Sequence, residues 1–392
     1  MLRLLTAGES HGSMLTLIVE GLPANIEISE EKINAAMARR QKGYGRGGRM
    51  LIEKDSVEVV AGVRFGKTTG SPVSMIIKNK DWENWLDDMA VFGKETSGRA
   101  LRRPRPGHAD LTGLWKYDLA EARPVLERAS ARETATRVAA GELVNALLQS
   151  MFIEVGSHVR AIGDVFLPEE ITLSVAQMCA IAEQSDVSCV CAQTAAKMRV
   201  AIDMAKTTGD TLGGIVEVAV DNVIPGLGSH VHWDRRLDGL LAQAVMSIPA
   251  FKAVEIGAGI KAATMLGGMV HDEIFPQPGG VCRGSNRAGG LEGGMTNGEQ
   301  LVVRGYMKPI PTLMQPLSSI DIKTGLQETA AAERSDTCAV PAAAVVAEAM
   351  VKWILAQAVL EKFAADNLRD LMLSVNSYRQ RIKEGGYGPC KW

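Results

Sequence analysis

Three groups of arginines are the clearest sign of chemistry in this sequence. A guanidinium group can donate two parallel hydrogen bonds to a carboxylate or a phosphate, so arginines around one pocket would suit a small substrate that carries both groups. The usual alternative is a solvated, charged surface. We favour binding, because each group is interleaved with Gly, Pro, His or Ser. The groups are Arg39, Arg40, Arg46 and Arg49, then Arg99, Arg102, Arg103 and Arg105, then Arg123, Arg128, Arg132 and Arg137.

Two histidines lie in similar surroundings and are candidate general acids. His11 lies in a glycine-flanked segment, and His108 lies among Arg, Pro, Gly and Asp in residues 103–110. Imidazole titrates near neutral pH and, beside cations, can donate a proton to a leaving phosphate or an anionic cofactor. A structural role is commoner for any single histidine. His230 and His232 could bind a metal from one strand face, but no third ligand and carboxylate are evident beside them, so we predict no metal site.

Two glycine motifs match known patterns, but their contexts argue against both. Residues 8–12 fit the G-x-S-x-G nucleophile elbow, which needs earlier strands and an oxyanion loop for which position 8 leaves no room. Residues 43–48 fit G-x-G-x-x-G, but a dinucleotide fingerprint follows a strand and opens a helix. Here a polar, helix-like segment (residues 30–42) precedes the glycines and a strand-like segment follows them. We therefore interpret residues 43–48 as a flexible anion-binding loop.

Composition limits the class of protein. The chain has 392 residues, of which 46% are hydrophobic and 22% charged, which is typical of a soluble globular protein and excludes a disordered or collagen-like chain. A net charge of -2 and an aromatic content of 5% argue against nucleic-acid binding. Six cysteines without a C-x-x-C pair indicate reduced, cytoplasmic thiols. The first residues lack an apolar signal segment, and Pro341, Glu348 and Lys352 interrupt the most apolar stretch, so we expect neither export nor a membrane span.

The periodicity of the chain predicts the elements that must position these residues. Strand-like segments cover residues 57–63, 72–77, 215–224 and 301–307, and their one charged face favours antiparallel pairing. Helical spacing occurs over residues 144–151, 237–245 and 346–360. Pro341 lies near the start of the last helix, with Ser335 or Asp336 as a possible cap.

Long segments rich in Gly, Arg and Pro separate these elements, at residues 41–50, 97–112, 276–298 and 307–316. They are too long for simple connectors, and their Arg, Gly and His content favours binding loops over linkers. No repeat or linker divides the chain. We predict a single α+β domain over residues 1–392.

Motifs spread along the whole chain resemble those of the chorismate synthase family. They are Gly8-Glu9-Ser10-His11-Gly12, Arg40-Gln41 followed by Gly43-Tyr44-Gly45-Arg46-Gly47-Gly48-Arg49-Met50, Arg105-Pro106-Gly107-His108-Ala109-Asp110, Leu126-Glu127-Arg128-Ala129-Ser130-Ala131-Arg132-Glu133-Thr134, Glu292-Gly293-Gly294-Met295-Thr296-Asn297-Gly298, Lys308-Pro309-Ile310-Pro311-Thr312 and Glu333-Arg334-Ser335-Asp336.

The resemblance implies a carbon–oxygen lyase of the shikimate pathway, which supplies aromatic amino acid biosynthesis. Such an enzyme converts 5-enolpyruvylshikimate 3-phosphate to chorismate by 1,4-anti-elimination of phosphate. Family members require reduced FMN, although the reaction has no net redox change. The phosphate and two carboxylates of that substrate would match the three arginine groups.

The resemblance also implies roles for individual residues. His11 would protonate the departing phosphate, His108 would protonate or stabilise the reduced flavin, and Asp336 would be the base that acts through the flavin. Pro249 stands where many members have Asn, which removes a side-chain amide and a backbone N–H. Substrate contacts would come from Ser10, Arg40, Arg46, Arg49, Arg105, Arg132 and Arg334. Contacts to FMN would come from Arg128, Ala129, Ser130, Pro249, Ala250, Gly293, Lys308, Pro309, Ile310, Pro311, Thr312 and Arg334.

The family fold implies central helices sandwiched between antiparallel sheets, assembled as a homotetramer. The short chain without a long insertion resembles the bacterial type, which relies on an external flavin reductant instead of using NADPH itself. A catalytically inactive relative that keeps the anion pocket as a binding protein is the rival hypothesis. The presence of His11, His108 and Asp336 argues against it.

Overall fold

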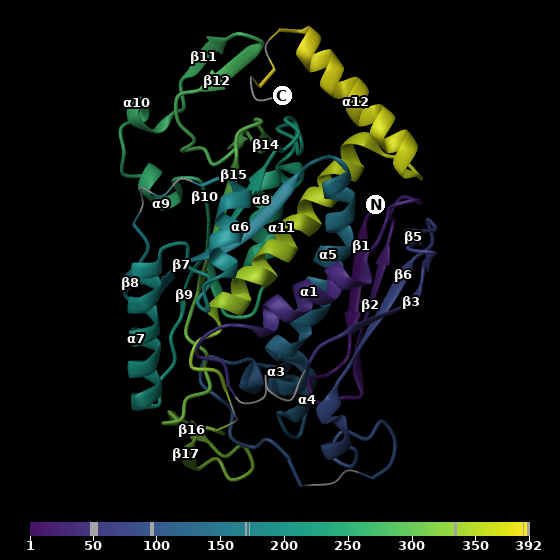
Figure 1. Cartoon of the computed structure of the whole chain (residues 1–392). Helices are drawn as coiled ribbons and strands as arrows, with labels where there is room; N and C mark the ends of the chain where they lie inside the picture. Colours follow the sequence, from purple (N-terminus) through teal and green to yellow (C-terminus); the bar gives the residue numbers. More distant parts are fainter. Residues whose placement is uncertain are drawn as a thin grey trace.

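Two antiparallel sheets enclose a layer of helices, as the sequence predicts (Figure 1). The computed structural model describes residues 1–47, 54–94, 98–168, 171, 173–332, 335–386 and 388–389. One continuous cluster of buried apolar side chains joins both sheets to the helices between them. The central sandwich therefore has a single core.

The first sheet contains the N-terminal strands. Its order is β1 (Arg3–Ala7), β2 (Met14–Glu20), β6 (Val73–Lys78) and β3 (Val57–Ala61), and each neighbouring pair is antiparallel. Leu15, Leu17 and Val19 alternate toward the core, whereas Ile18 on the other face is exposed. This alternation is the period-two pattern of a sheet with one covered face.

The second sheet is also antiparallel throughout. Its order is β10 (Phe251–Ile256), β15 (Leu301–Met307), β9 (Gly214–Asp221), β7 (Glu154–Ile162) and β8 (Val165–Phe166). The four segments that the sequence predicted to be strands form β3, β6, β9 and β15, with ends shifted by a few residues. The sequence did not predict β1, β2, β7 or β10.

The helical layer consists of α1 (Glu30–Gln41), α5 (Thr134–Ser150), α8 (Leu237–Met246) and α11 (Val340–Phe363). Helices α5 and α11 approach very closely, because Gly141 faces Ala349: a Cβ at Gly141 would lie 2.5 Å from the Cβ of Ala349. Helix α11 is apolar and long enough to cross a membrane, but 89% of its most apolar window is buried inside the protein. It is therefore the core helix of the sandwich.

The start of α11 differs from the prediction. Ala339 occupies the N-cap position without a side-chain hydrogen bond, and Pro341 lies in the first turn. The expected cap by Ser335 or Asp336 is wrong, because the helix begins several residues later and the Asp336 carboxylate bonds to another segment. Pro341 itself removes one of the donors that would otherwise need a partner at the helix start.

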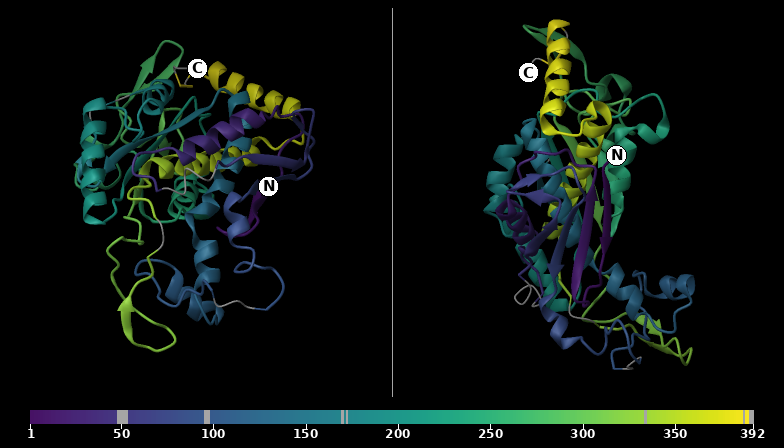
Figure 2. Two further views of the ribbon diagram at one scale, coloured as in Figure 1. Left: turned by 60° about the horizontal axis from the view of Figure 1, so that its bottom comes forward. Right: turned by 90° about the vertical axis from the view of Figure 1, so that its right-hand side faces the viewer.

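Smaller elements extend both ends of the sandwich (Figures 1 and 2). At one end lie α3 (Asp110–Tyr117), α4 (Arg123–Ala129) and the hairpin of β16 (Ser318–Ile320) and β17 (Gln327–Thr329). At the other end lie α12 (Leu368–Glu384) and the hairpin of β11 (Ile274–Gln277) and β12 (Gly280–Arg283). Helix α6 (Val175–Glu183) packs on β7, and α7 (Ala192–Thr208) packs on β7 and β8.

The remaining elements are short. They are β4 (Val63–Arg64), β5 (Lys67–Thr68), β13 (Leu291–Glu292), β14 (Met295–Thr296), α9 (Gly259–Ala262), α10 (Gly267–Val270) and the 3-10 turns Lys80–Asn84, Ala131–Glu133 and Trp233–Arg235. The segment 276–298, expected to be a binding loop, therefore contains two hairpins.

Candidate active site

A cavity of about 670 Å³ lies where the N-terminal turns of α5 and α11 meet the loops at one end of the sandwich. Its size is within the range of small-molecule sites. Both helix N-termini carry partial positive charge, which favours anionic ligands. The segments that line the cavity include the β1–β2 turn, the glycine loop after α1, and residues 105–109, 128–133, 248–250, 307–312 and 335–339.

One wall of the cavity carries more positive charge than its carboxylates can neutralise. Arg40 Nη1 lies 3.3 Å from Asp55 Oδ2, and Arg132 Nη1 lies 2.5 Å from Asp55 Oδ1, so two buried guanidinium groups share one carboxylate. Among the residues that the structure describes, none supplies a hydrogen-bond partner to the buried Arg132 Nη2. Burial disfavours the charged form of Arg40 more than Asp55 favours it, which lowers the pKa of Arg40 to about 10. An anionic ligand would supply the missing acceptor.

His11 is held firmly at the edge of this wall. Its Nδ1 lies 2.9 Å and 3.0 Å from the two carboxylate oxygens of Glu127, and its backbone N–H donates to Glu127 Oε2 at 2.7 Å. The indole of Trp85 stacks on the imidazole, with ring centroids 3.9 Å apart and planes 25° apart. Because Nδ1 is occupied by Glu127, Nε2 is the ring nitrogen that can serve a ligand in the cavity.

His108 belongs to a second carboxylate cluster. Its Nδ1 lies 2.5 Å from Asp110 Oδ1, and Arg105 donates from Nε to Asp110 Oδ2 at 2.9 Å. Arg105 Nη1 also donates to Thr312 Oγ1 at 3.0 Å. Burial opposes ionisation of Asp110, but the hydrogen bonds from His108 and Arg105 outweigh burial and hold its pKa well below the ordinary value. These contacts orient both His108 and Arg105 beside the cavity.

Asp336 is bound to the glycine loop that follows α1. Gly47 N–H donates to its Oδ1 at 2.6 Å, and Arg46 Nη1 lies 2.9 Å from its Oδ2. The carbonyl of Gly45 accepts the Thr337 N–H at 2.9 Å. Gly45 has a φ of 85°, and a Cβ there would lie 2.9 Å from Ile202, so this close approach requires glycine. The loop and residues 335–338 are therefore positioned together.

The rest of the cavity lining is mainly apolar. Lys308 also lines the cavity and donates from Nζ to the Gly107 carbonyl at 3.0 Å. Burial, with a smaller effect of Lys252, lowers the pKa of Lys308. The apolar lining residues include Ile248, Pro249, Ala250, Met307, Ile310, Pro311, Ala339, Ala342, Ala343 and Val346. A planar ring system with anionic substituents fits such a cavity, because the lining combines apolar and cationic side chains.

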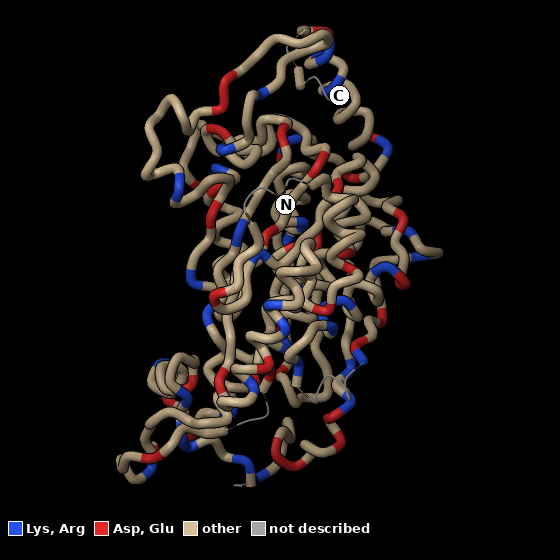
Figure 3. The backbone as a smooth tube through the Cα atoms, turned by 60° about the vertical axis from the view of Figure 1, so that its left-hand side comes forward, with Lys and Arg blue, Asp and Glu red and all other residues tan. Residues whose placement is uncertain are grey.

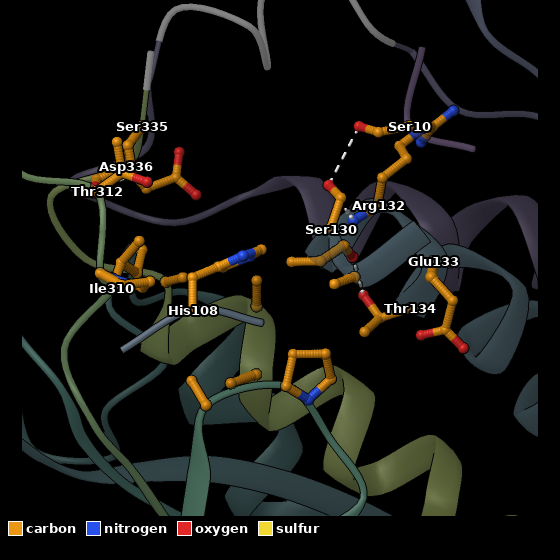
Figure 4. A pocket seen from close by; sticks show the side chains of 18 of the residues that line it. Ser10, His108, Ser130, Arg132, Glu133, Thr134, Ile310, Thr312, Ser335 and Asp336 are labelled. Atoms are coloured by element: carbon orange, nitrogen blue, oxygen red, sulfur yellow. Dashed lines mark hydrogen bonds between the residues drawn. The ribbon is translucent and has the colours of Figure 1, made fainter. Parts of the chain in front are cut away.

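The structure brings most of the predicted site residues to this cavity. Figure 4 shows Thr312 and Asp336 on one side and Ser10, Ser130 and Arg132 on the other, with His108 between them. Those that line it are Ser10, His11, Arg40, Arg46, Arg105, His108, Arg128, Ala129, Ser130, Arg132, Pro249, Ala250, Lys308, Ile310, Pro311, Thr312 and Asp336.

Four predicted residues are not among the lining residues. Pro309 lies between the lining residues Lys308 and Ile310 but is not itself a lining residue. Gly293 lies between β13 and β14, and a Cβ built on it would lie 3.9 Å from the Cβ of His230. Arg49 and Arg334 lie outside the described residues. The three arginine groups also divide: Arg39 pairs with Glu348 in the core, and the Arg99 guanidinium lies over the Trp85 ring.

The residues that orient the site have no recognisable pattern of their own in the sequence. They are Asp55, Asn79, Trp85, Asp110 and Glu127. Asn79 shows why they matter: its Nδ2 donates to the carbonyls of Glu9 and Gly12, and its Oδ1 accepts from Arg132 Nε, so it joins the His11 turn to Arg132. Of these residues, Asp110 and Glu127 lie within motifs that resemble the family, at residues 105–110 and 126–134. That position is the signal in the sequence that points to them.

Comparisons with known proteins identify the family of this chain. The family model described as chorismate synthase matches residues 2–360. A chorismate synthase of Moorella thermoacetica is 55% identical over 385 residues, covering 98% of this chain and 100% of the relative. One of Brevibacillus brevis is 52% identical over 382 residues, covering 96% and 98%.

A crystal structure of chorismate synthase superposes with a TM-score of 0.80 at 41% identity, covering 98% of both chains. The sequence resemblance and the sandwich fold are thereby confirmed. The chain belongs to the chorismate synthase family.

Proposed function

We propose that this chain catalyses the chorismate synthase reaction, the 1,4-anti-elimination of phosphate from 5-enolpyruvylshikimate 3-phosphate. The observation that carries the proposal is the unbalanced positive charge around Asp55, where Arg40 and Arg132 share one carboxylate and Arg132 Nη2 lacks an acceptor among the described residues. A substrate with one phosphate and two carboxylates supplies such acceptors. Family membership supports the same reaction.

Reduced FMN fits the apolar half of the cavity. The ring would lie against residues 248–250 and 310–311, while Arg128, Ser130, Lys308 and Thr312 offer polar contacts nearby. When bound, reduced FMN would supply a transient electron that assists loss of phosphate and is returned, so that the reaction has no net redox change. Pro249 contributes shape but no donor at its position.

His11 is the proposed acid for the departing phosphate. Glu127 occupies Nδ1, so a proton would leave from Nε2. Glu127 also positions Ser10, because the Ser10 N–H donates to the backbone carbonyl of Glu127 at 3.1 Å. His108, held by Asp110, would stabilise an anionic ring system next to Arg105.

Asp336 is the proposed proton acceptor. In this structure its carboxylate pairs with Arg46. An anionic substrate would compete for the Arg46 guanidinium and leave the Asp336 oxygens available for the proton. This exchange links substrate binding to the availability of the base.

We further propose a homotetramer supplied with reduced flavin by an external reductant in the cytoplasm. Figure 3 shows that Lys and Arg positions alternate with Asp and Glu positions along the described part of the chain.

The test is an anaerobic assay with chemically reduced FMN and 5-enolpyruvylshikimate 3-phosphate, following chorismate absorbance and phosphate release. We expect turnover with pre-reduced FMN and none with oxidised FMN plus NADPH. Turnover from NADPH would contradict the external-reductant proposal. Binding of both ligands without turnover would instead support the rival, an inactive relative that only binds.

Two substitutions test the assigned roles in that assay. His11→Ala and Asp336→Asn should each lower kcat by at least about 10²-fold while the substrate still binds, because each removes a positioned acid or base. Unchanged turnover in either variant would refute the role of that residue.

A further inference from the structure

Glu127 is a buried carboxylate that the reaction scheme does not use. Its side chain has no exposed surface, and it contacts the His11 segment at the backbone and at the ring. The Arg123 guanidinium also lies beside Glu127, with Nη1 3.5 Å from Oε1. A buried carboxylate in these contacts accepts hydrogen bonds from every neighbour and donates none.

Two donors of His11 converge on this carboxylate. The backbone N–H approaches Oε2 at 2.7 Å, and Nδ1 approaches Oε1 at 2.9 Å. An acceptor-only partner requires that Nδ1 carry a proton, which fixes the tautomer of the ring. In the neutral ring Nε2 is then unprotonated, and a second proton on Nε2 creates a positive charge that Glu127 compensates at short distance.

Trp85 restricts the ring from its face. The indole stacks on the imidazole at 3.9 Å, and the Arg99 guanidinium lies over the same indole at 4.0 Å. Trp85 is itself anchored, because its Nε1 donates to Asp81 Oδ2 at 3.0 Å. The imidazole of His11 is therefore held by Trp85 at its face and by Glu127 at its Nδ1 edge.

We propose that Glu127 is a positioning residue that makes His11 a charged acid with its mobile proton on Nε2. This inference rests on the proposed function. In the step, the Nε2–H bond breaks and that proton bonds to a phosphate oxygen, while the electron pair of the breaking C–O bond goes to the phosphate. The electron pair of the substrate's breaking C–H bond enters the new double-bond system, and that hydrogen leaves as a proton to Asp336. The ring returns to its neutral form with the Nδ1 proton still held by Glu127.

The first test needs neither flavin nor substrate. Protein labelled with ¹⁵N-histidine is examined by solid-state NMR, and the His11 signals are identified by their loss in His11→Asn. We expect a protonated Nδ1 in the wild type. In Glu127→Gln, one of the two donors of His11 must face an amide NH₂, so the Nδ1 proton should be lost or exchange with solvent at least about tenfold faster.

Two further variants keep the test decisive. Glu133→Gln is the matched control: Glu133 lines the same cavity but pairs with Arg137, so the His11 signals should not move. If Glu127→Gln does not fold, as judged by circular dichroism, Glu127→Asp replaces it. That variant keeps an acceptor-only group with a shorter reach, so we expect Nδ1 to stay protonated but to exchange at least about tenfold faster.

Turnover gives the second measurement. Glu127→Gln should lower kcat by about 10-fold to 100-fold with substrate affinity changed less than about twofold, because only the acid is impaired. Unchanged His11 signals in the folded Glu127 variant would overturn the proposal, whatever the rate. Absence of turnover in the wild type would refute the proposed function and leave the NMR result as a separate finding.

Discussion

Arg39 and Arg40 are neighbours at the end of α1, yet they enter two differently built charge clusters. Arg39 binds both oxygens of Glu348, at 3.0 Å and 2.9 Å, and Lys352 lies between Glu348 and Glu142, at 2.9 Å and 3.0 Å. This core cluster has two cations and two anions. The pocket cluster of Arg40, Arg132 and Asp55 has two cations and one anion.

The difference between the clusters separates a structural use of charge from a binding use. In the core cluster Glu348 also accepts from Ser157 Oγ at 2.8 Å, so both of its oxygens are used. Burial opposes the charge of Lys352, but Glu348 and Glu142 outweigh burial and raise its pKa. In the pocket cluster, burial outweighs Asp55 and lowers the pKa of Arg40 to about 10. The balanced cluster is complete, whereas the unbalanced one favours an anion.

Breaking the core cluster should have the largest effect on stability. Glu348→Gln leaves the buried Lys352 and the partly exposed Arg39 with Glu142 alone, which should cost about 3 kcal/mol of unfolding free energy. Urea unfolding at one protein concentration measures the loss. The control is Glu361→Gln in the exposed pair with Arg235, where we expect a change within about 1 kcal/mol. Equal losses in both variants would show that burial does not distinguish them.

Acid should abolish that same contribution. Burial raises the pKa of Glu348, but Lys352 and Arg39 outweigh burial, so the pKa lies below its ordinary value. A lowered pKa in the folded state means that the stabilisation is present above the unfolded pKa of about 4.3 and is lost as the pH falls below it. The gap in unfolding free energy between wild type and Glu348→Gln should therefore shrink between about pH 5 and pH 3. A gap that widens on acidification would contradict this sign.

Removing the excess cation should affect binding more than stability. Arg132→Ala leaves Arg40 and Asp55 as a balanced pair, so it should destabilise the protein less than Glu348→Gln does. It also removes the donors offered to the substrate, and affinity for 5-enolpyruvylshikimate 3-phosphate should fall about tenfold to a hundredfold. Calorimetric titration measures the affinity. A stability loss equal to that of the core variant, with affinity unchanged, would make the pocket cluster structural.

The smallest effect should come from the support of the glycine loop. Tyr44 Oη donates to Asp203 Oδ1 at 2.8 Å, and Tyr44 N–H donates to the Asp186 carbonyl at 2.7 Å, which docks the loop on α7 and the turn before it. Tyr44→Phe removes one hydrogen bond worth about 0.5–1.5 kcal/mol. We expect a rise in KM of about threefold to tenfold, measured in the anaerobic assay. Asp203→Ala should raise KM by the same factor, because it removes the same hydrogen bond. Unequal rises in KM would show that this hydrogen bond is not what supports the loop.

The sequence predicted the fold best where periodicity was strong. Strand β15 matches the expected residues 301–307, and α5, α8 and α11 lie where apolar spacing indicated helices. Strands β1 and β2 lack a clear period-two signal in the sequence, because apolar residues are adjacent at Leu4 and Leu5 and at residues 17–19. The segment 276–298 is predicted as a loop because it is rich in glycine and its hairpin strands are too short to show an alternating pattern.

For the site, residue types predicted the ligand chemistry but not the partners. Arginines, glycines and two histidines along the chain indicated an anion pocket, and His11, His108 and Asp336 all line it. Arg39 was grouped with Arg40, although the helix directs them to different clusters. Asp55 and Trp85 gave no signal, since a lone acid or aromatic residue has no pattern.

The sequence by itself determined the family, the kinds of side chain available for binding, and those strands and helices whose apolar spacing is regular: β3, β6, β9, β15, α5, α8 and α11. Only the tertiary structure decided which cations are neutralised and which remain for a ligand. Glu127 and His11 are 116 positions apart, and Arg39 and Glu348 are 309 apart. Hydrogen bonds and ion pairs depend on distances of about 3 Å, and such distances between remote residues exist only after the sheets and helices have packed.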